Sequence, residues 1–505
     1  MQGVGNSIRL CVAVAACLAF VVGVPAIAAA AVDDETVLIR LERLEKRQAE
    51  LESELAARDA RIRELERQAA AGAVAAAGTM PPPAPVAAAA SGAPSDAQHA
   101  AMAEPGHHGR FQPEGGGFRL VDAPNGELGF NAWAYVRYLN QEGLDTTYTD
   151  AFGRTTTLDI RNDVQVNKVN LYFNGWVFDP RFHFNFWTWT TNTAQGEPAQ
   201  IVLAGDLGYR FSDKFDLRFG VLPLPGTRSL RGQHPRWNKV DHRTIGNEFF
   251  RPSFTTGIIA NGQLAEGLHY RAAIANNMSA LGVSAAQLDD EFNTVAAGIW
   301  WMPTTGEYGT GTGYGDFDYH EELATQFGLS VSRSRESRQN QPGTEDPENT
   351  QLRLSDGTLL FRPDAFGTGG TIEKATYRML AADAGFKYRG VEVAGEAYFR
   401  WIDDFVHTGP IPVAELYDYG FELQASAMLL PETLGAYVAG SKIYGEYGEP
   451  WDLGVGVNWY PFGEQLIRVN AEMLYLEDSP VGYSSVPFAV GGNGWVFQTN
   501  FESRF

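Results

Sequence analysis

From residue 117 onward, apolar and polar residues alternate one by one along many short segments. In one of them Phe182, Phe184 and Phe186 are separated by His183 and Asn185. A period of two is that of a β-strand with one apolar and one polar face. No run of eighteen apolar residues interrupts this pattern, so no membrane-spanning helix is expected in this region. The apolar face of every strand must therefore be covered, either by packing against other parts of the protein or by contact with lipid.

The last segment of the chain shows the same alternation in its clearest form. The apolar positions Trp495, Phe497 and Phe501 share a face that ends at Phe505, while Gln498 and its polar neighbours share the other. Strands with an apolar outer face and terminal aromatics are typical of transmembrane β-barrels. A terminal Phe also resembles the signal that outer-membrane barrels present to their assembly machinery. That resemblance implies the same role for Phe505.

These observations predict an all-β fold, a transmembrane antiparallel β-barrel occupying residues 117–505. At about 24 residues per strand and connection, this length accommodates about sixteen strands around a water-filled lumen. Short turns are expected at 179–180, 212–213 and 461–463, and long external loops at 303–321, 333–373 and 403–416. The aromatic pairs Trp187 with Trp189 and Trp300 with Trp301 are expected in the interfacial belt, with sugar stacking as the alternative. A secreted β-sandwich is the alternative fold for the alternation.

Residues 1–31 read as a secretory signal peptide. Arg9 precedes an apolar stretch from Leu10 to Val24, and small residues follow before a cleavage site ahead of Val32. A retained membrane anchor and a lipoprotein modified at Cys17 are the alternatives. The only cysteines of the chain, Cys11 and Cys17, lie within this segment, so the exported product would have neither a disulfide nor a cysteine-based metal site.

Residues 32–68 predict a short coiled-coil helix, and residues 69–116 a flexible Ala/Pro-rich linker. Apolar residues recur at alternating steps of four and three from Val37 to Leu65, with Gln48 and Arg58 as polar exceptions in the seam. A single solvated helix is the alternative. The linker contains Pro81-Pro82-Pro83 and three histidines, which we interpret as solvated rather than metal-binding.

Composition excludes several classes of function. The formal net charge of −22 and the lack of a long basic run argue against a nucleic-acid partner. No G-x-S-x-G occurs, and the barrel histidines lack spacing such as H-E-x-x-H, so neither a hydrolase nor a metal enzyme is expected. We expect no catalytic residue, metal or cofactor.

One connection departs from the overall acidity. Residues 221–257 contain six basic residues against only Asp241 and Glu248. Guanidinium groups facing a narrow lumen bind oxyanions through forked hydrogen bonds. The segment therefore predicts an anion-selective pore constriction. In the alternative interpretation, some of its arginines pair with lumen carboxylates or line a subunit interface. The candidate anion-binding residues are Arg228, Arg231, Arg236, Lys239, Arg243 and Arg251.

Residues 117–505 resemble the phosphate-selective porin O and P family. The resemblance is carried by Gly129-Phe130, Tyr135, Arg137, Leu171, Phe173, Gly175, Asp179-Pro180-Arg181-Phe182, Gly220, Pro223, Pro225, Arg243, Phe249, Arg251-Pro252, Gly257, Gly267 and Tyr270. It implies sixteen strands, a homotrimer and a third loop folded into the pore. An N-terminal coiled coil occurs in this broad family, whereas the Ala/Pro linker departs from its better-known members.

The resulting hypothesis is a porin of the bacterial outer membrane with a periplasmic coiled coil. It would pass small hydrophilic solutes by passive diffusion, with anions such as phosphate preferred. The expected partners are further copies of the chain, outer-membrane lipid and lipopolysaccharide, and the barrel assembly machinery. The alternative is a structural tether from the outer membrane to peptidoglycan through the coiled coil, with a general or cation-preferring pore.

Overall fold

The computed structural model describes residues 110–112, 117–191, 200–231, 237–240, 242–278, 291–309, 313–339, 347–482 and 486–504. The predicted signal peptide, the coiled coil and almost all of the linker lie outside the described residues, as does Phe505, and their roles stay predictions. A three-residue strand, β1 (Arg110–Gln112), belongs to the segment predicted as linker and pairs with β2 (Gly117–Ala123).

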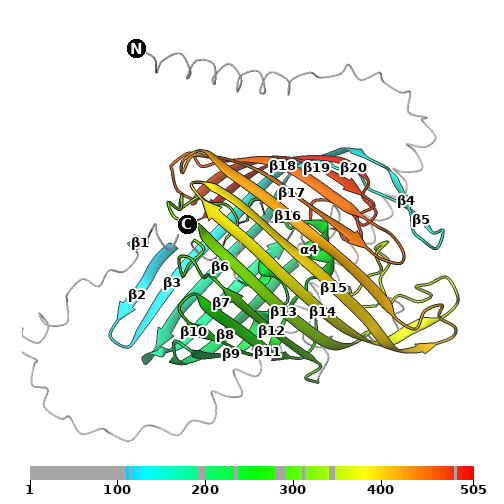
Figure 1. Ribbon diagram of the computed structural model, residues 1–505, viewed down its shortest axis with the longest axis horizontal. Helices are drawn as coiled ribbons and strands as arrows, with labels where there is room; N and C mark the ends of the chain where they lie inside the picture. Colours follow the sequence, from blue (N-terminus) through cyan, green and yellow to red (C-terminus); the bar gives the residue numbers. More distant parts are fainter. Residues whose placement is uncertain are drawn as a thin grey trace, which may run out of the picture. The chain divides into compact units, whose positions relative to one another are not determined.

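Within the described residues, sixteen antiparallel strands close into a barrel, as the sequence predicted (Figure 1). Each strand pairs with the next along the chain, and the last, β20, pairs with the first, β3, in a register that places Asn500 opposite Arg137. The strands are β3 (Gly126–Leu144), β6 (Asn162–Val177), β7 (Asp179–Thr191), β8 (Gln200–Ser212), β9 (Phe215–Pro223), β10 (Phe254–Ala265), β11 (Leu268–Ala275), β12 (Thr294–Trp301), β13 (Ala324–Ser337), β14 (Thr371–Tyr388), β15 (Val391–Thr408), β16 (Leu416–Leu430), β17 (Leu434–Tyr444), β18 (Trp451–Trp459), β19 (Ile467–Glu477) and β20 (Gly494–Arg504).

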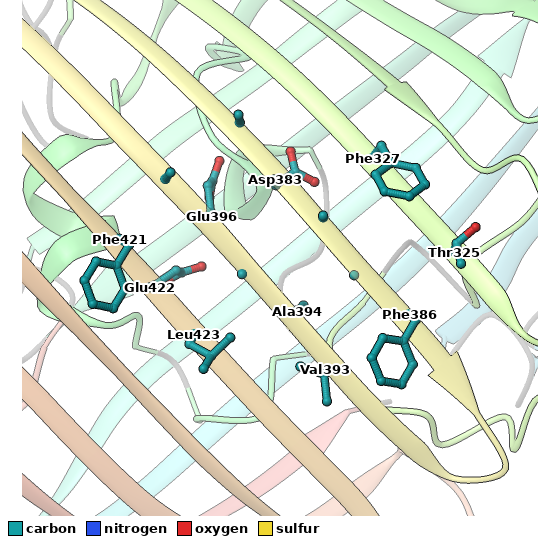
Figure 2. A pocket seen from close by; sticks show the side chains of 15 residues that line it. Thr325, Phe327, Asp383, Phe386, Val393, Ala394, Glu396, Phe421, Glu422 and Leu423 are labelled. Atoms are coloured by element: carbon teal, nitrogen blue, oxygen red, sulfur yellow. The ribbon is translucent and has the colours of Figure 1, made fainter.

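The barrel wall has an apolar outer face and a polar inner face. On β18 the outward Leu453, Val455 and Val457 are 43%, 57% and 42% exposed, while Asp452 and Asn458 point inward and are buried. Figure 2 shows the same alternation on β16, where Glu422 lies between the outward Phe421 and Leu423, beside a hollow of about 640 Å³ in the wall. An exposed apolar band around a closed sheet is the surface that lipid covers.

Aromatic side chains gather on the outer face near both ends of the strands. One group contains Trp401 and Tyr417, whose ring centroids lie 5.4 Å apart, and Tyr475 with Trp495 at 5.1 Å. Such rings suit the membrane interface. Trp301 also faces outward and is 50% exposed, as predicted.

Three other tryptophans do not occupy the predicted belt. Trp187 and Trp189 share the face of His183, which bonds to the buried Asp216 at 2.7 Å, and therefore point into the lumen. Trp300 faces inward as well, because it is adjacent to the outward Trp301 on β12. Periodicity alone gave two faces for each strand and did not say which of them is outside.

The two ends of the barrel differ in their connections. At one end, here called the turn end, most strands are joined by a few residues. Arg389 and Gly390, with φ of 49° and 80°, make a two-residue turn between β14 and β15. At the other end, the loop end, the connections are mostly longer. The predicted turns at 179–180, 212–213 and 461–463 all lie at or beside turn-end connections, which confirms them as turns.

Residues 302–323 are the long exception at the turn end. The length of 303–321 predicts an external loop, but this segment joins β12 to β13 and lies at the opposite end from 338–370 and 409–415. This prediction was wrong because the side of a connection depends on strand order, which alternates, and not on length.

Several loop-end connections fold into the barrel and form an apolar core there. Phe361 and Phe366 from 338–370, Phe488 from 478–493 and Phe250 from 224–253 belong to one buried cluster with wall residues such as Leu474. The hairpin β4 (Thr147–Thr149) and β5 (Thr155–Thr157) lies in the connection 145–161 and bonds to 338–370, where the Ala151 amide donates to Asp356 at 3.0 Å. In the described part of the chain, no helix has both the length and the apolarity needed to cross a bilayer.

An outward charge in the middle of β18 tests the assignment of the faces. Val455→Arg should destabilise the barrel by about 2–4 kcal/mol, because a guanidinium would enter the hydrocarbon region. Urea unfolding in lipid vesicles measures this loss, and Val455→Leu serves as the control that keeps the position apolar. Equal stability of the two variants would mean that this face does not contact lipid.

Candidate functional site

The connection 224–253 is the third at the loop end, and it folds back inside the barrel, as the family resemblance implied. It contains a 3-10 turn, η1 (Arg228–Leu230), and a short helix, α4 (Ile245–Phe250), which lies behind β15 and β16 in Figure 1. Thr244 caps α4 by accepting a hydrogen bond from the Asn247 amide at 3.3 Å. The Gly246 amide donates to Ser441 on β17 at 2.8 Å, so the helix is bound to the wall.

The predicted basic residues of this connection pair with carboxylates of the barrel wall. Arg228 lies 2.9 Å from Glu392 on β15, and Lys239 lies 2.9 Å from Glu472 on β19. Arg231 forms an ion pair with Asp383 on β14. The three basic side chains are at most 2% exposed. These contacts match the alternative interpretation given above, in which the loop arginines bind lumen carboxylates.

The other predicted residues lie within the loop itself. Arg243 lies 3.3 Å from Glu248, and the Nε of Arg251 donates to the same carboxylate at 2.8 Å. Arg243 also lies over the ring of Trp237, 4.3 Å from its centroid. Arg236 is outside the described residues. The role of all six residues in binding anions stays a prediction, and the structure adds that five of them have acidic partners.

Arg228 is the point where two inward-folded segments meet. Its guanidinium lies 4.2 Å from the ring centroid of Tyr314 and 5.4 Å from that of Tyr308, and both tyrosines belong to the turn-end connection 302–323. Cations over aromatic faces are attracted to the ring electrons, more so when water is excluded. Tyr314 also donates to Glu422 on β16 at 3.2 Å. The loop from one end and the segment from the other are therefore joined inside the lumen.

The wall that faces the loop is acidic. Asp383, Glu396 and Glu422 come from three adjacent strands, β14 to β16, and their carboxylates lie close together in Figure 2. Glu396 accepts hydrogen bonds at 2.9 Å from both the Arg228 amide and the Tyr398 hydroxyl. Sequence reasoning missed these acids, although each occupies a polar position of an alternating strand. In the residues described, no group of three or more His, Asp or Glu side chains is arranged to hold a metal ion.

A different set of basic residues is more accessible. Arg210 on β8 is exposed, Arg218 on β9 is 26% exposed, and Arg271 on β11 is half-buried. Arg218 pairs with Asp206 and Asp216, whereas Arg210 and Arg271 form no ion pair within the described ranges. Arg271 donates to the backbone carbonyl of Leu230 at 3.1 Å.

Arg210 and Arg271 line a cavity of about 310 Å³ near the turn end. His269 and Trp300 line the same cavity, with their rings stacked 5.5 Å apart at 11°. Arg210 and Arg271 were not among the candidate anion-binding residues, because they lie on separate strands and no local basic run marks them.

No family model matches the chain, and no curated protein matches it. Among solved structures, an anion-selective porin from Comamonas acidovorans is similar over 75% of this chain and 100% of its own, at 9% identity and a TM-score of 0.47. OmpT of Vibrio cholerae in a trimer form covers 75% and 100%, at 10% identity and 0.45. The outer membrane channel DcaP of Acinetobacter baumannii covers 77% and 99%, at 9% identity and 0.44. Because all three TM-scores are below 0.5, the barrel assignment rests on the strand pairings of this chain.

The buried pair of Arg228 and Glu392 should be energetically coupled. In a double-mutant cycle with Arg228→Met and Glu392→Gln, we expect a coupling of about 0.5–3 kcal/mol, because either single change leaves the other charge buried without its partner. Unfolding in vesicles measures it. The exposed pair Asp179 and Arg181 is the matched control and should show about 0.2–1 kcal/mol. Equal coupling in the two cycles would contradict a dry loop–wall contact.

His320 makes the turn-end segment sensitive to pH. Its Nε2 lies 3.0 Å from Glu307 and its Nδ1 bonds to Asp316. Burial lowers the pKa of His320, but the hydrogen bonds to Asp316 and Glu307 outweigh it and hold the pKa above the usual 6.5. A raised pKa in the folded state means that protonation stabilises the fold. This stabilisation is complete below the unfolded pKa and is lost as the pH rises through the folded pKa.

The stability difference between the natural chain and His320→Gln should follow that rule. We expect it to be largest below about pH 6.5 and to shrink toward higher pH. Urea unfolding of both proteins in vesicles across this range measures the difference. A difference that grows with pH would show that burial dominates and that the imidazole is neutral in the folded protein.

Proposed function

We propose that this protein is a porin of the bacterial outer membrane that carries small hydrophilic solutes by passive diffusion and prefers anions, inorganic phosphate among them. The observation that carries the proposal is the closed sixteen-stranded barrel with an apolar exterior, a polar interior and a loop folded inside. Sixteen strands enclose a lumen too wide for side chains of the wall alone to fill.

The preference for anions rests on which charges a solute can meet. The cations of the inward loop are buried against carboxylates, so their fields are largely neutralised. Arg210 and Arg271, in contrast, face a cavity that Asp213 and Asp216 also line, and the two arginines form no ion pair among the described residues. A guanidinium in a low-dielectric channel attracts anions strongly and offers them forked hydrogen bonds. Anion attraction is therefore proposed chiefly for these two side chains, with the loop residues setting the width of the pore.

Several further features belong to the same proposal. A homotrimer, binding to lipopolysaccharide and recognition of Phe505 by the assembly machinery follow from the family resemblance and from the outer-membrane location. A contact of the coiled coil with peptidoglycan is not part of this proposal and belongs to the tether alternative. Catalysis is not proposed, because the sequence contains neither G-x-S-x-G nor H-E-x-x-H.

Reversal potentials across a KCl gradient in planar bilayers test the channel and its preference together. We expect chloride to be preferred over potassium, and Arg271→Gln to lower that preference by about twofold or more by removing a cation that lines the cavity. Arg181→Gln is the matched control, since Arg181 is 57% exposed at a turn and pairs with Asp179.

Three outcomes contradict parts of this proposal. A protein that leaves the bilayer insulating is not a channel. A preference for potassium favours the tether alternative with its cation-preferring pore. An equal effect of the two arginine substitutions would remove Arg271 from the solute path.

A further inference from the structure

An aromatic strip lies on the inner face of the barrel toward the loop end. It consists of Tyr172 on β6 with Trp187 and Trp189 on β7. On β7 these tryptophans follow Asn185 at steps of two, and Asn185 points inward because its amide donates to the buried Asp206 at 3.3 Å. All three aromatic side chains are partly exposed, and Tyr172 also packs against the buried Trp133, with ring centroids 4.4 Å apart.

The strip is continuous and has a cation beside it. Tyr172 and Trp187 pair across the two strands, and their rings stack at 22° with centroids 6.3 Å apart. The Lys168 ammonium lies 4.7 Å from the centroid of the Trp189 ring. Flat rings next to a positive charge favour a ligand that has a planar or apolar ring face together with a negative group.

The arginine cavity lies further along the same part of the wall. Along β7 toward the turn end, Asn185 is followed by His183. The neighbouring strands β8 to β12 carry residues that line the cavity, namely Arg210, Arg271 and the stacked pair of His269 and Trp300. A solute that crosses the barrel along this wall therefore meets aromatic faces at one point and, at another, the cavity that Arg210 and Arg271 line together with Asp213 and Asp216.

We infer that the channel binds, as preferred solutes, organic anions that combine a carboxylate with a ring, such as aromatic acids or sugar acids. This inference rests on the proposed channel function and specifies its solute class. Apart from the Lys168 charge, the strip offers no stacking contact to an inorganic oxyanion or to acetate, because neither has a ring face. A neutral ring compound gains nothing from Arg210 and Arg271. A ring carboxylate uses both parts of the wall and should therefore pass in preference to ions of similar charge.

Bi-ionic reversal potentials test this in planar bilayers holding the full-length protein. Potassium benzoate on one side and potassium acetate on the other give the benzoate-to-acetate permeability ratio, and potassium glucuronate replaces benzoate in a second arm. We expect both ring anions to be favoured over acetate in the natural protein. The variant Trp187→Leu with Trp189→Leu should lower the ratio by about two- to tenfold, as expected for lost ring stacking.

The control is Trp301→Leu, which removes a lipid-facing tryptophan and should leave the ratio unchanged. If the double variant does not insert, block of the chloride current in the natural protein provides the second measurement. Benzoate should reduce that current in a saturable way, and acetate should not.

The outcomes separate this inference from the function on which it rests. A chloride-preferring channel with the same benzoate-to-acetate ratio before and after the tryptophan substitutions overturns the ring inference and leaves the porin. A potassium-preferring channel overturns the anion proposal itself. A response to benzoate but not to glucuronate assigns the strip to aromatic acids, and the reverse result assigns it to sugar acids.

Discussion

The pairing of β20 with β3 is the contact on which the rest of the structure depends. It joins residues more than 350 positions apart, such as Asn500 and Arg137, whose side chains also bond at 2.8 Å. Without it the sheet would have two open edges, whose unpaired amides and carbonyls are costly in a bilayer. With it, each strand has a fixed inner and outer face. Every later feature, from the aromatic rings outside to the charges inside, follows from this assignment of faces.

Closure of the barrel leaves an interior that the side chains of the strands cannot fill. In this chain, connections from both ends of the barrel fold into it. The connection 224–253 enters from the loop end and 302–323 from the turn end, and they meet where Arg228 lies against Tyr308 and Tyr314. Such a junction needs a charge that cannot be lost at any physiological pH and that tolerates burial between aromatic faces, which is why an arginine suits the position. The ion pair to Glu392 then ties the junction to the wall.

Strand alternation, together with the length of the alternating region, was sufficient to predict the barrel and its approximate strand number, whereas the loop that folds inside was implied by the family resemblance. The same pattern did not say which face of β7 or β12 is the outer one, so Trp187, Trp189 and Trp300 were expected in the membrane interface although they lie in the lumen. Nor did it place 302–323 at the correct end. The partners of the loop cations were beyond local reasoning as well, since Arg228 and Glu392 are 164 residues apart and only the barrel register brings them together. Local periodicity determines the two faces and the length of each strand, whereas the register between strands determines which side chains pair.

This difference changes where the selectivity of the pore should be sought. A basic loop in an acidic chain suggests an anion filter. Here, however, the loop cations pair with Glu392, Asp383 and Glu472, so their charges are neutralised and the loop is bound to the wall between β14 and β19. Because the charges next to the loop are neutralised, the charges on the opposite part of the barrel wall determine the electric field in the part of the lumen that stays open. We propose that Arg210 and Arg271 act there, from single positions on separate strands with no basic run in the sequence to mark them. The net charge of −22 is thus a poor guide to ion preference, because paired charges cancel locally and only the unpaired ones that face water act on a passing solute.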